Sequence, residues 1–225
     1  YFIDNHVSNG ADYQYLFTYI STNKERLGRK LGDYFNQKMQ PQILREIEKK
    51  GILSTPYVNI HGDSPDDGFP AFMDSPRYAT GYTTLLNTLG TVAETHMLKP
   101  YKDRVRATYE YMLSSINDVE KNVAEIQKLM WESFTELQPG KKYPIQWKID
   151  STKFQLIDFK GFEAGKKTSE VSGKPRLFYD RTKPFTRKVK FFNEYQPTKE
   201  ITIPSFYIIP KSENKVIEFL KRNHI

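Results

Sequence analysis

The residues of this chain that are best suited to acid, base or metal chemistry are four histidines and one glutamate, and cysteine is absent. His6 follows a short apolar stretch, and Glu94 ends another, with His96 two residues later. Burying a lone carboxylate is costly, so Glu94 at the end of an apolar run needs a partner or a function. A neutral imidazole is the commonest metal ligand in proteins, and a carboxylate near an activated water can act as a general base.

Each of these residues also has a purely structural interpretation. A lone histidine at a strand end is often only a hydrogen-bonded structural residue, and Glu94 could pair with Arg77 or Lys99. His61 in a polar loop and His224 at the tail are expected to lie on the surface. The metal interpretation therefore requires the first histidine and the glutamate to lie close together in the fold.

The expected elements of residues 1–138 form a partial mixed α/β sheet with crossover helices. Strand-like composition occupies residues 1–5, 15–20, 56–60 and 89–94. Residues 24–50 have helical periodicity that Pro41 should split, and residues 61–76 are expected to form a long loop. Ligands of open α/β sheets bind beyond the carboxyl ends of strands, which is where the histidine and the glutamate are expected.

Residues 101–137 contain neither Gly nor Pro and predict one long helix, on the order of 55 Å in length. Apolar residues alternate in steps of four and three along it, a pattern that needs a partner helix or a domain surface. Self-association through residues 105–130 is one expectation, and a break at residues 117–118 is the alternative. The apolar positions are Val105, Tyr109, Met112, Ile116, Val119, Val123, Ile126 and Met130.

The charge of the chain changes sign near Pro139 and Gly140, which form a turn signal. Residues 1–140 carry 15 Lys and Arg against 18 Asp and Glu, a net of −3, whereas residues 141–225 carry 19 against 9, a net of +10. We therefore expect two domains, residues 1–138 and a basic accessory domain over residues 139–225. The second consists of short strand-like runs and a terminal helix, which predicts a small antiparallel β domain. The expected strands, separated by Gly, Pro and charged turns, are residues 143–149, 153–159, 176–179, 187–192, 199–203 and 206–209.

The basic half offers a rival, non-enzymatic function. Cations interleaved with aromatic residues could hold nucleic acid or an anionic glycan, because cations contact phosphates while rings stack on bases. A solvated strand face with its aromatic residues turned inward explains the same pattern, so a nucleic-acid partner is not favoured. The residues are Arg181, Lys183, Phe185, Arg187, Lys188, Lys190, Phe191 and Phe192.

Two segments resemble zinc carboxypeptidases of the carboxypeptidase A type. Residues 94–101 (ETHMLKPY), preceded by residues 76–82 (PRYATGY), are similar to the last catalytic segment of that family. Residues 4–6 (DNH) with the polar loop that follows resemble the strand end that supplies its third zinc ligand. The resemblance covers about residues 1–130.

This resemblance implies a peptide substrate, a Zn²⁺ cofactor and hydrolysis of C-terminal peptide bonds. By it, His6 would be a zinc ligand and Glu94 the general base, while Arg77 would bind the terminal carboxylate of the substrate. Tyr78 or Tyr82 would supply a phenol, and the spacing does not choose between them. The family also favours an exported, periplasmic or extracellular protein.

The sequence departs from that family in its histidines. The other two zinc ligands of the family come from an H-x-x-E segment, and no histidine here has Glu three residues later. A zinc site needs three protein ligands and a water, so we expect a fragment of a larger enzyme that is inactive alone. A non-catalytic relative that binds peptide, glycan or nucleic acid is the alternative. No stretch approaches the roughly 20 apolar residues of a membrane span, and no G-x-S-x-G elbow or Gly-rich phosphate loop is present.

Overall fold

The computed structural model of the protein describes residues 1–60, 62 and 64–225, and its contacts group them into two compact units. The larger unit comprises Tyr1–Glu136 and Lys148–Gln196, and the smaller comprises Leu137–Trp147 and Pro197–Ile225. This grouping differs from the expected boundary after residue 138, because residues 148–196 pair and pack with the first part of the chain. His61 and Asp63 lie outside the described residues, so the surface position expected for His61 stays a prediction.

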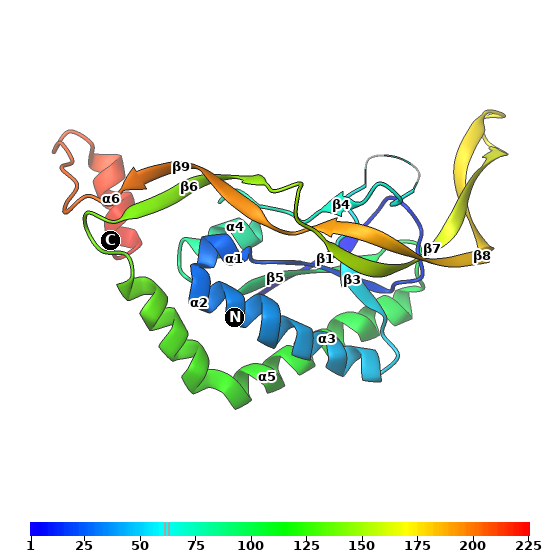
Figure 1. The fold of residues 1–225 in the computed structure, drawn as a ribbon, viewed down its shortest axis with the longest axis horizontal. Helices are drawn as coiled ribbons and strands as arrows, with labels where there is room; N and C mark the ends of the chain where they lie inside the picture. The colour runs from blue at the N-terminus through cyan, green and yellow to red at the C-terminus, as the bar shows by residue number, and fades with distance from the viewer. Residues whose placement is uncertain (61, 63) are drawn as a thin grey trace. The chain divides into compact units, whose positions relative to one another are not determined.

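A four-stranded mixed sheet forms the centre of the larger unit (Figure 1). Its strands, in spatial order, are β1 (Phe2–Ser8), β5 (Gly90–His96), β2 (Phe17–Ser21) and β3 (Ser54–Pro56). β1 runs parallel to β5, β5 antiparallel to β2, and β2 parallel to β3. The α/β class expected from the sequence is confirmed, and the four predicted strands are present with shifted ends.

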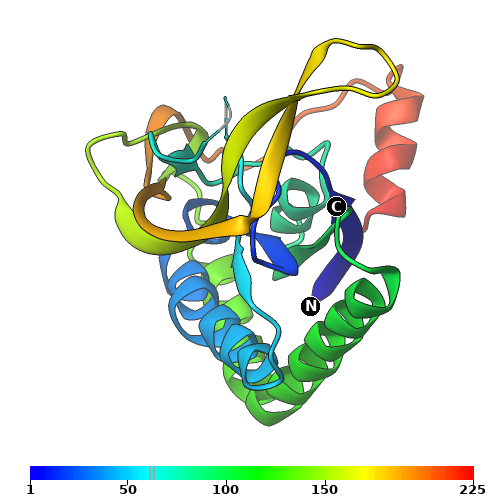
Figure 2. The same ribbon diagram turned by 90° about the vertical axis from the view of Figure 1, so that its right-hand side faces the viewer.

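Helices pack against the sheet and complete its apolar core (Figures 1 and 2). They are α1 (Lys24–Leu27), α2 (Arg29–Asp33), the π-helix η1 (Tyr34–Met39), α3 (Gln40–Lys49) and α5 (Tyr101–Thr135). Phe17, Phe35, Ile43 and Tyr111 are among the fully buried members of this core. Pro41 does not break the helical segment as expected: it is the second residue of α3, and α3 follows the π-helix η1 without a gap. The Gln40 N–H just before it bonds to the Phe35 carbonyl, five residues back, so the hydrogen bonding of the segment changes immediately ahead of the proline.

The long helix α5 is continuous over Tyr101–Thr135, as its composition predicts. No break falls at residues 117–118, but the ribbon changes direction along its length, so both halves follow the body of the unit (Figure 1). Ala107 and Tyr111 pack in the core near its start, and Ile126 packs there in the second half. Other apolar side chains of the same helix stay exposed, among them Tyr109 and Ile116, each 61% exposed.

A second sheet of the larger unit contains β4 (Phe69–Pro70), β8 (Pro175–Phe192) and β7 (Gln155–Thr168), in that order. β7 and β8 form a long antiparallel hairpin, so the two short strands expected within residues 176–192 are one. Tyr13, Tyr15, Phe69, Phe159 and Phe191 bury their rings in a second apolar cluster at this sheet. The cluster explains why the hairpin belongs to the same compact unit as the first strands.

The smaller unit consists of a two-stranded sheet and a helix. β6 (Lys142–Ile149) pairs with β9 (Tyr195–Thr202), and α6 spans Asn214–Arg222. Residues 206–209, expected as a strand, have no strand assignment. Throughout the described part of the chain, we find no helix with the length and apolar character that crossing a membrane demands.

Candidate functional site

The two residues singled out for chemistry occupy paired positions of neighbouring strands. His6 of β1 lies opposite Glu94 of β5 in the parallel ladder. Side chains at paired positions project to the same face of a sheet, so the imidazole and the carboxylate meet. The distance from His6 Nδ1 to Glu94 Oε1 is 3.6 Å. The structure therefore brings together the histidine and the glutamate that the sequence analysis required to be close.

Asp4 completes a row of three ionisable side chains on this face. It lies two residues before His6 on β1, and alternate residues of a strand share a face. Its Oδ2 atom is 2.9 Å from His6 Nε2. Both ring nitrogens of the imidazole thus face carboxylates, and a contact of this kind holds a ring in one orientation.

Glu94 is the buried member of the row. Its side chain is 9% exposed, against 50% for His6, and Oε2 has no hydrogen-bond partner among the described residues. Burial raises the pKa of Glu94; His6 partly opposes this shift and Asp4 adds to it. A carboxylate with a raised pKa and an unpaired oxygen is suited to accept a proton.

Two tyrosines border the carboxylate, and sequence reasoning missed both. Burial raises the pKa of Tyr13 to about 12, with further contributions from Tyr57 and Glu94. Burial also raises the pKa of Tyr57, and Glu94 again adds to the shift. Both phenols are therefore neutral near pH 7 and able to donate hydrogen bonds. Tyr57 is far from His6 and Glu94 in sequence. Tyr13 follows His6 closely, but it lies outside β1, in an isolated bridge with Gly161, so the alternation of the strand could not place it.

The structural alternatives considered for Glu94 and its neighbours have a clear outcome. Lys99 contacts Asp12, at 3.0 Å, and not Glu94. His96 is fully buried, accepts a hydrogen bond from the Leu98 N–H at 3.1 Å, and has a pKa lowered by burial. His96 is thus a structural residue beside the site.

The residues expected to bind substrate lie on the surface near α4 (Ala79–Thr84). Arg77, Tyr78 and Tyr82 are exposed, the two tyrosines at 57% and 51%. Within the described residues, none of the three makes a hydrogen bond or ion pair with His6 or Glu94. The expected substrate role of these three residues has no support from side-chain contacts.

The side chains of His6, Asp4 and Glu94 would supply part of the ligand set of a zinc site. An imidazole and two carboxylates are suitable zinc ligands, and the unpaired Oε2 of Glu94 is an orphaned acceptor. However, each carboxylate faces a ring nitrogen, and the described residues contain no group of three or more His, Cys, Asp or Glu arranged to hold a metal ion. The side chains present fit a zinc ion only in part.

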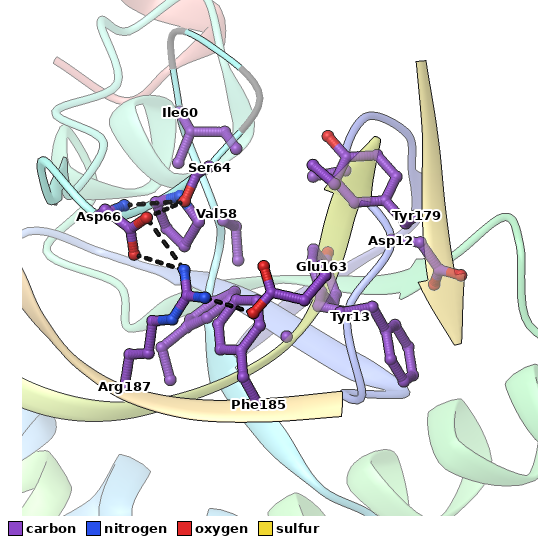
Figure 3. A pocket seen from close by; sticks show the side chains of 16 residues that line it. Asp12, Tyr13, Val58, Ile60, Ser64, Asp66, Glu163, Tyr179, Phe185 and Arg187 are labelled. Carbon is purple, nitrogen blue, oxygen red and sulfur yellow. Dashed lines mark hydrogen bonds and ion pairs between the residues drawn. The ribbon is translucent and has the colours of Figure 1, made fainter. Parts of the chain in front are cut away.

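The basic strand residues form ion pairs within the larger unit. Arg187 bonds to both oxygens of Asp66 and to Glu163, and its guanidinium stacks 4.0 Å from the ring centre of Phe185 (Figure 3). Arg181 bonds to Asp12 at 2.6 Å. These contacts line a cavity of about 160 Å³, and they neutralise cations that the rival interpretation needs for phosphate binding.

Comparison with known proteins found no match to a family model, a curated protein or a solved structure.

Proposed function

We propose that this chain is part of a zinc-dependent metallocarboxypeptidase that hydrolyses C-terminal peptide bonds. The observation that carries the proposal is the pairing of His6 with Glu94, a buried carboxylate with a raised pKa and an unpaired oxygen. Both residues lie within their strands, before the last residues of β1 and β5, and not beyond the strand ends as expected. That arrangement places a base beside an imidazole that can hold a metal ion.

In this proposal His6 holds the metal through one ring nitrogen, and Asp4 orients the ring through the other. Zinc would supply Lewis acidity to the scissile carbonyl and to the attacking water. Glu94 takes a proton from that water as the water oxygen bonds to the carbonyl carbon. Glu94 then returns the proton to the amine nitrogen as the C–N bond breaks. The phenols of Tyr13 and Tyr57 are neutral near pH 7 and add no charge beside Glu94.

The remaining zinc ligands come from outside these 225 residues in this proposal, because a catalytic zinc site takes three protein ligands and one open position. The isolated chain should then bind zinc weakly and lack peptidase activity. Isothermal titration of the isolated chain with zinc checks this. Submicromolar binding that disappears in His6→Ala would contradict the incomplete site.

The peptidase role is tested with the complete protein that carries this chain and a peptide labelled at its last residue. The wild type should release the label, and Glu94→Gln should lower kcat by about 10²–10⁴-fold. Glu48→Gln, an exposed position on α3, is the matched control. A substrate with an amidated C-terminus should resist cleavage. Full activity of Glu94→Gln would remove Glu94 from its role.

Binding of the terminal carboxylate is assigned in this proposal to Arg77, with Tyr78 or Tyr82 as the phenol. All three are exposed, so substrate can reach them. Arg77→Ala should raise KM for free-carboxylate substrates by at least tenfold with the chemical step intact. An unchanged KM would exclude Arg77 from substrate binding.

We also propose that α5 mediates self-association through residues 105–130. Val105, Tyr109, Ile116 and Val123 are between 46% and 61% exposed, and such a row of apolar side chains is typical of helix–helix contacts. Sedimentation of the wild type should reveal a dimer that Ile116→Glu abolishes. A wild type that stays monomeric at high concentration would contradict the proposal.

A further inference from the structure

A cavity separate from the His6–Glu94 pair lies beyond the carboxyl ends of β2 and β3 in the larger unit. Ser21 and Tyr57 line it from those strand ends, and Gln40 lines it from the start of α3. Its volume is about 360 Å³, which lies within the range of about 300–1,000 Å³ of small-molecule sites. Carboxyl ends of strands in an α/β sheet are the usual place for a ligand.

Gln40 brings an unpaired amide group to this cavity. The residue is 3% exposed, and its Oε1 accepts hydrogen bonds from the hydroxyls of Tyr1, Tyr111 and Thr91 at 3.1–3.4 Å. Those three hydroxyls use one end of the amide, and Nε2 has no partner among the described residues. An amide turned the other way would leave its oxygen unpaired instead. Either way, one buried polar atom lacks a partner, which is unfavourable.

Two further lining residues have unpaired buried atoms, Asn193 Oδ1 and Ser21 Oγ. Buried polar groups are nearly always hydrogen-bonded, so each of these atoms leaves room for a partner that the chain does not supply. The described residues have nine such atoms, and three of them belong to residues that line this cavity. Together they offer a donor, an acceptor and a hydroxyl that can act as either. A ligand that pairs with them must therefore both donate and accept.

The charges of the cavity lining are paired with each other. Among the described lining residues the charged ones are Lys24 and Glu194, and they pair with each other at 2.5 Å. The remaining polar lining is dominated by amide side chains, which have no net charge. These are Asn23, Asn36, Gln37, Gln40, Gln155 and Asn193.

Aromatic rings supply the apolar part of the wall. Tyr57 and Phe72 meet edge to face with their centres 5.3 Å apart, and Tyr19 also lines the cavity. The π-helix η1 contributes Asn36 to the opposite wall, and π-helical turns occur frequently at functional sites. The combination is a polar wall of amides beside a wall of rings.

We propose that this cavity binds a neutral sugar. A sugar presents several hydroxyls, each of which donates and accepts, and these match the unpaired amide and hydroxyl atoms of Gln40, Asn193 and Ser21. Its C–H face packs on the rings of Tyr57 and Phe72. The paired charges of the lining give an anionic sugar no counter-ion. Tyr57 also borders Glu94, but the sugar proposal uses its ring and does not depend on the peptidase proposal.

NMR titration of the 225-residue chain with glucose, galactose and N-acetylglucosamine tests this site. At least one sugar should shift the side-chain amide signals of Gln40 and Asn193 in a saturable manner. Asn193→Ala should weaken that binding about tenfold. The same change should not lower Tm, because the Oδ1 atom that it removes has no partner. Asn117→Ala, at an exposed position of α5, should change neither quantity.

Three results would overturn the proposal. The first is that none of the three sugars produces saturable shifts at these amides. The second is unchanged affinity in Asn193→Ala with a lower Tm, which would make Asn193 a structural residue. The third is saturable binding of a neutral dipeptide amide with no response to the sugars, which would assign the cavity to peptides.

Discussion

His6 Nδ1 lies 3.6 Å from Glu94 Oε1, although β1 and β5, the strands that carry them, are far apart in the chain. Their contact depends on the register of β1 and β5, since a shift by one residue would turn one side chain to the other face. The imidazole is half exposed while the carboxylate is buried. The imidazole is therefore open to solvent, whereas the carboxylate beside it is largely shielded.

Glu94→Gln should leave the protein as stable as the wild type or more stable at neutral pH. Burial raises the pKa of Glu94, so the ionised carboxylate is disfavoured by the folded state. A neutral amide of the same shape avoids this cost. Thermal unfolding at pH 7 measures the effect. A Tm lowered by more than a few degrees would mean that the carboxylate supports the fold, and would complicate its assignment as a base.

Asp12→Asn should destabilise the larger unit by about 2 kcal/mol, because it leaves two cations without their buried partner. Asp12 is 5% exposed and contacts Lys99 at 3.0 Å and Arg181 at 2.6 Å. Chemical denaturation at pH 7 gives the free energy of unfolding. Asp180→Asn, whose exposed ion pair with Lys183 spans 3.6 Å, is the control and should have little effect.

The contribution of Asp12 should disappear in acid. Burial alone would raise the pKa of Asp12, but Arg181 and Lys99 hold it below the ordinary value of 3.8. A carboxyl group whose pKa is lower in the folded state stabilises the protein above its unfolded pKa, and that stability is lost as the pH falls towards the folded value. The wild type should therefore exceed Asp12→Asn in stability at pH 7, and the difference should shrink below pH 3.8. A difference that stays constant with pH would contradict the ion-pair explanation.

Arg187→Lys should lower stability by about 1 kcal/mol despite keeping the charge. The guanidinium bonds to both oxygens of Asp66, reaches Glu163 and stacks on Phe185, and an ammonium cannot reproduce this geometry (Figure 3). Lys188→Arg, which keeps its single contact with Asp158, should be neutral. Equal melting temperatures for the wild type and Arg187→Lys would show that charge alone is sufficient.

Gly32→Ala should destabilise the protein by about 2 kcal/mol, although alanine is normally the better helix former by about 1 kcal/mol. A Cβ atom at Gly32 would lie 2.3 Å from the backbone oxygen of Lys24, which cannot move aside cheaply. Gly165→Ala is the matched control, because its Cβ would lie 3.8 Å from Phe178. A more stable Gly32→Ala would show that α1 and α2 can separate without cost.

Local patterns in the sequence predicted many of the elements. Alternation and apolar runs predicted the four strands of the first sheet, and the heptad pattern predicted α5. Pro41 was expected to split a helix, yet the helical segment continues through it. The interruption between helices lies earlier, at Gly28 between α1 and α2, and the hydrogen bonding becomes π-helical in η1. Charged residues in the middle of β8 suggested two separate strands. In the structure, one strand continues through these residues because it pairs with β7 on both sides of them.

The sequence by itself determined which residues could do chemistry, since the types of His6 and Glu94 and their places next to apolar runs are local properties. Only the tertiary structure decided which groups lie beside them, namely Asp4 next to His6 and two tyrosine phenols near Glu94. It also decided that Lys99 pairs with Asp12, and that unpaired polar atoms of Gln40 and Asn193 belong to residues around one cavity. The physical reason is that hydrophobic and turn patterns act over a few residues, whereas strand register and hairpin packing join segments far apart in the chain. Electrostatics follows from that assembly, because burial and neighbouring charges exist only once the segments have met.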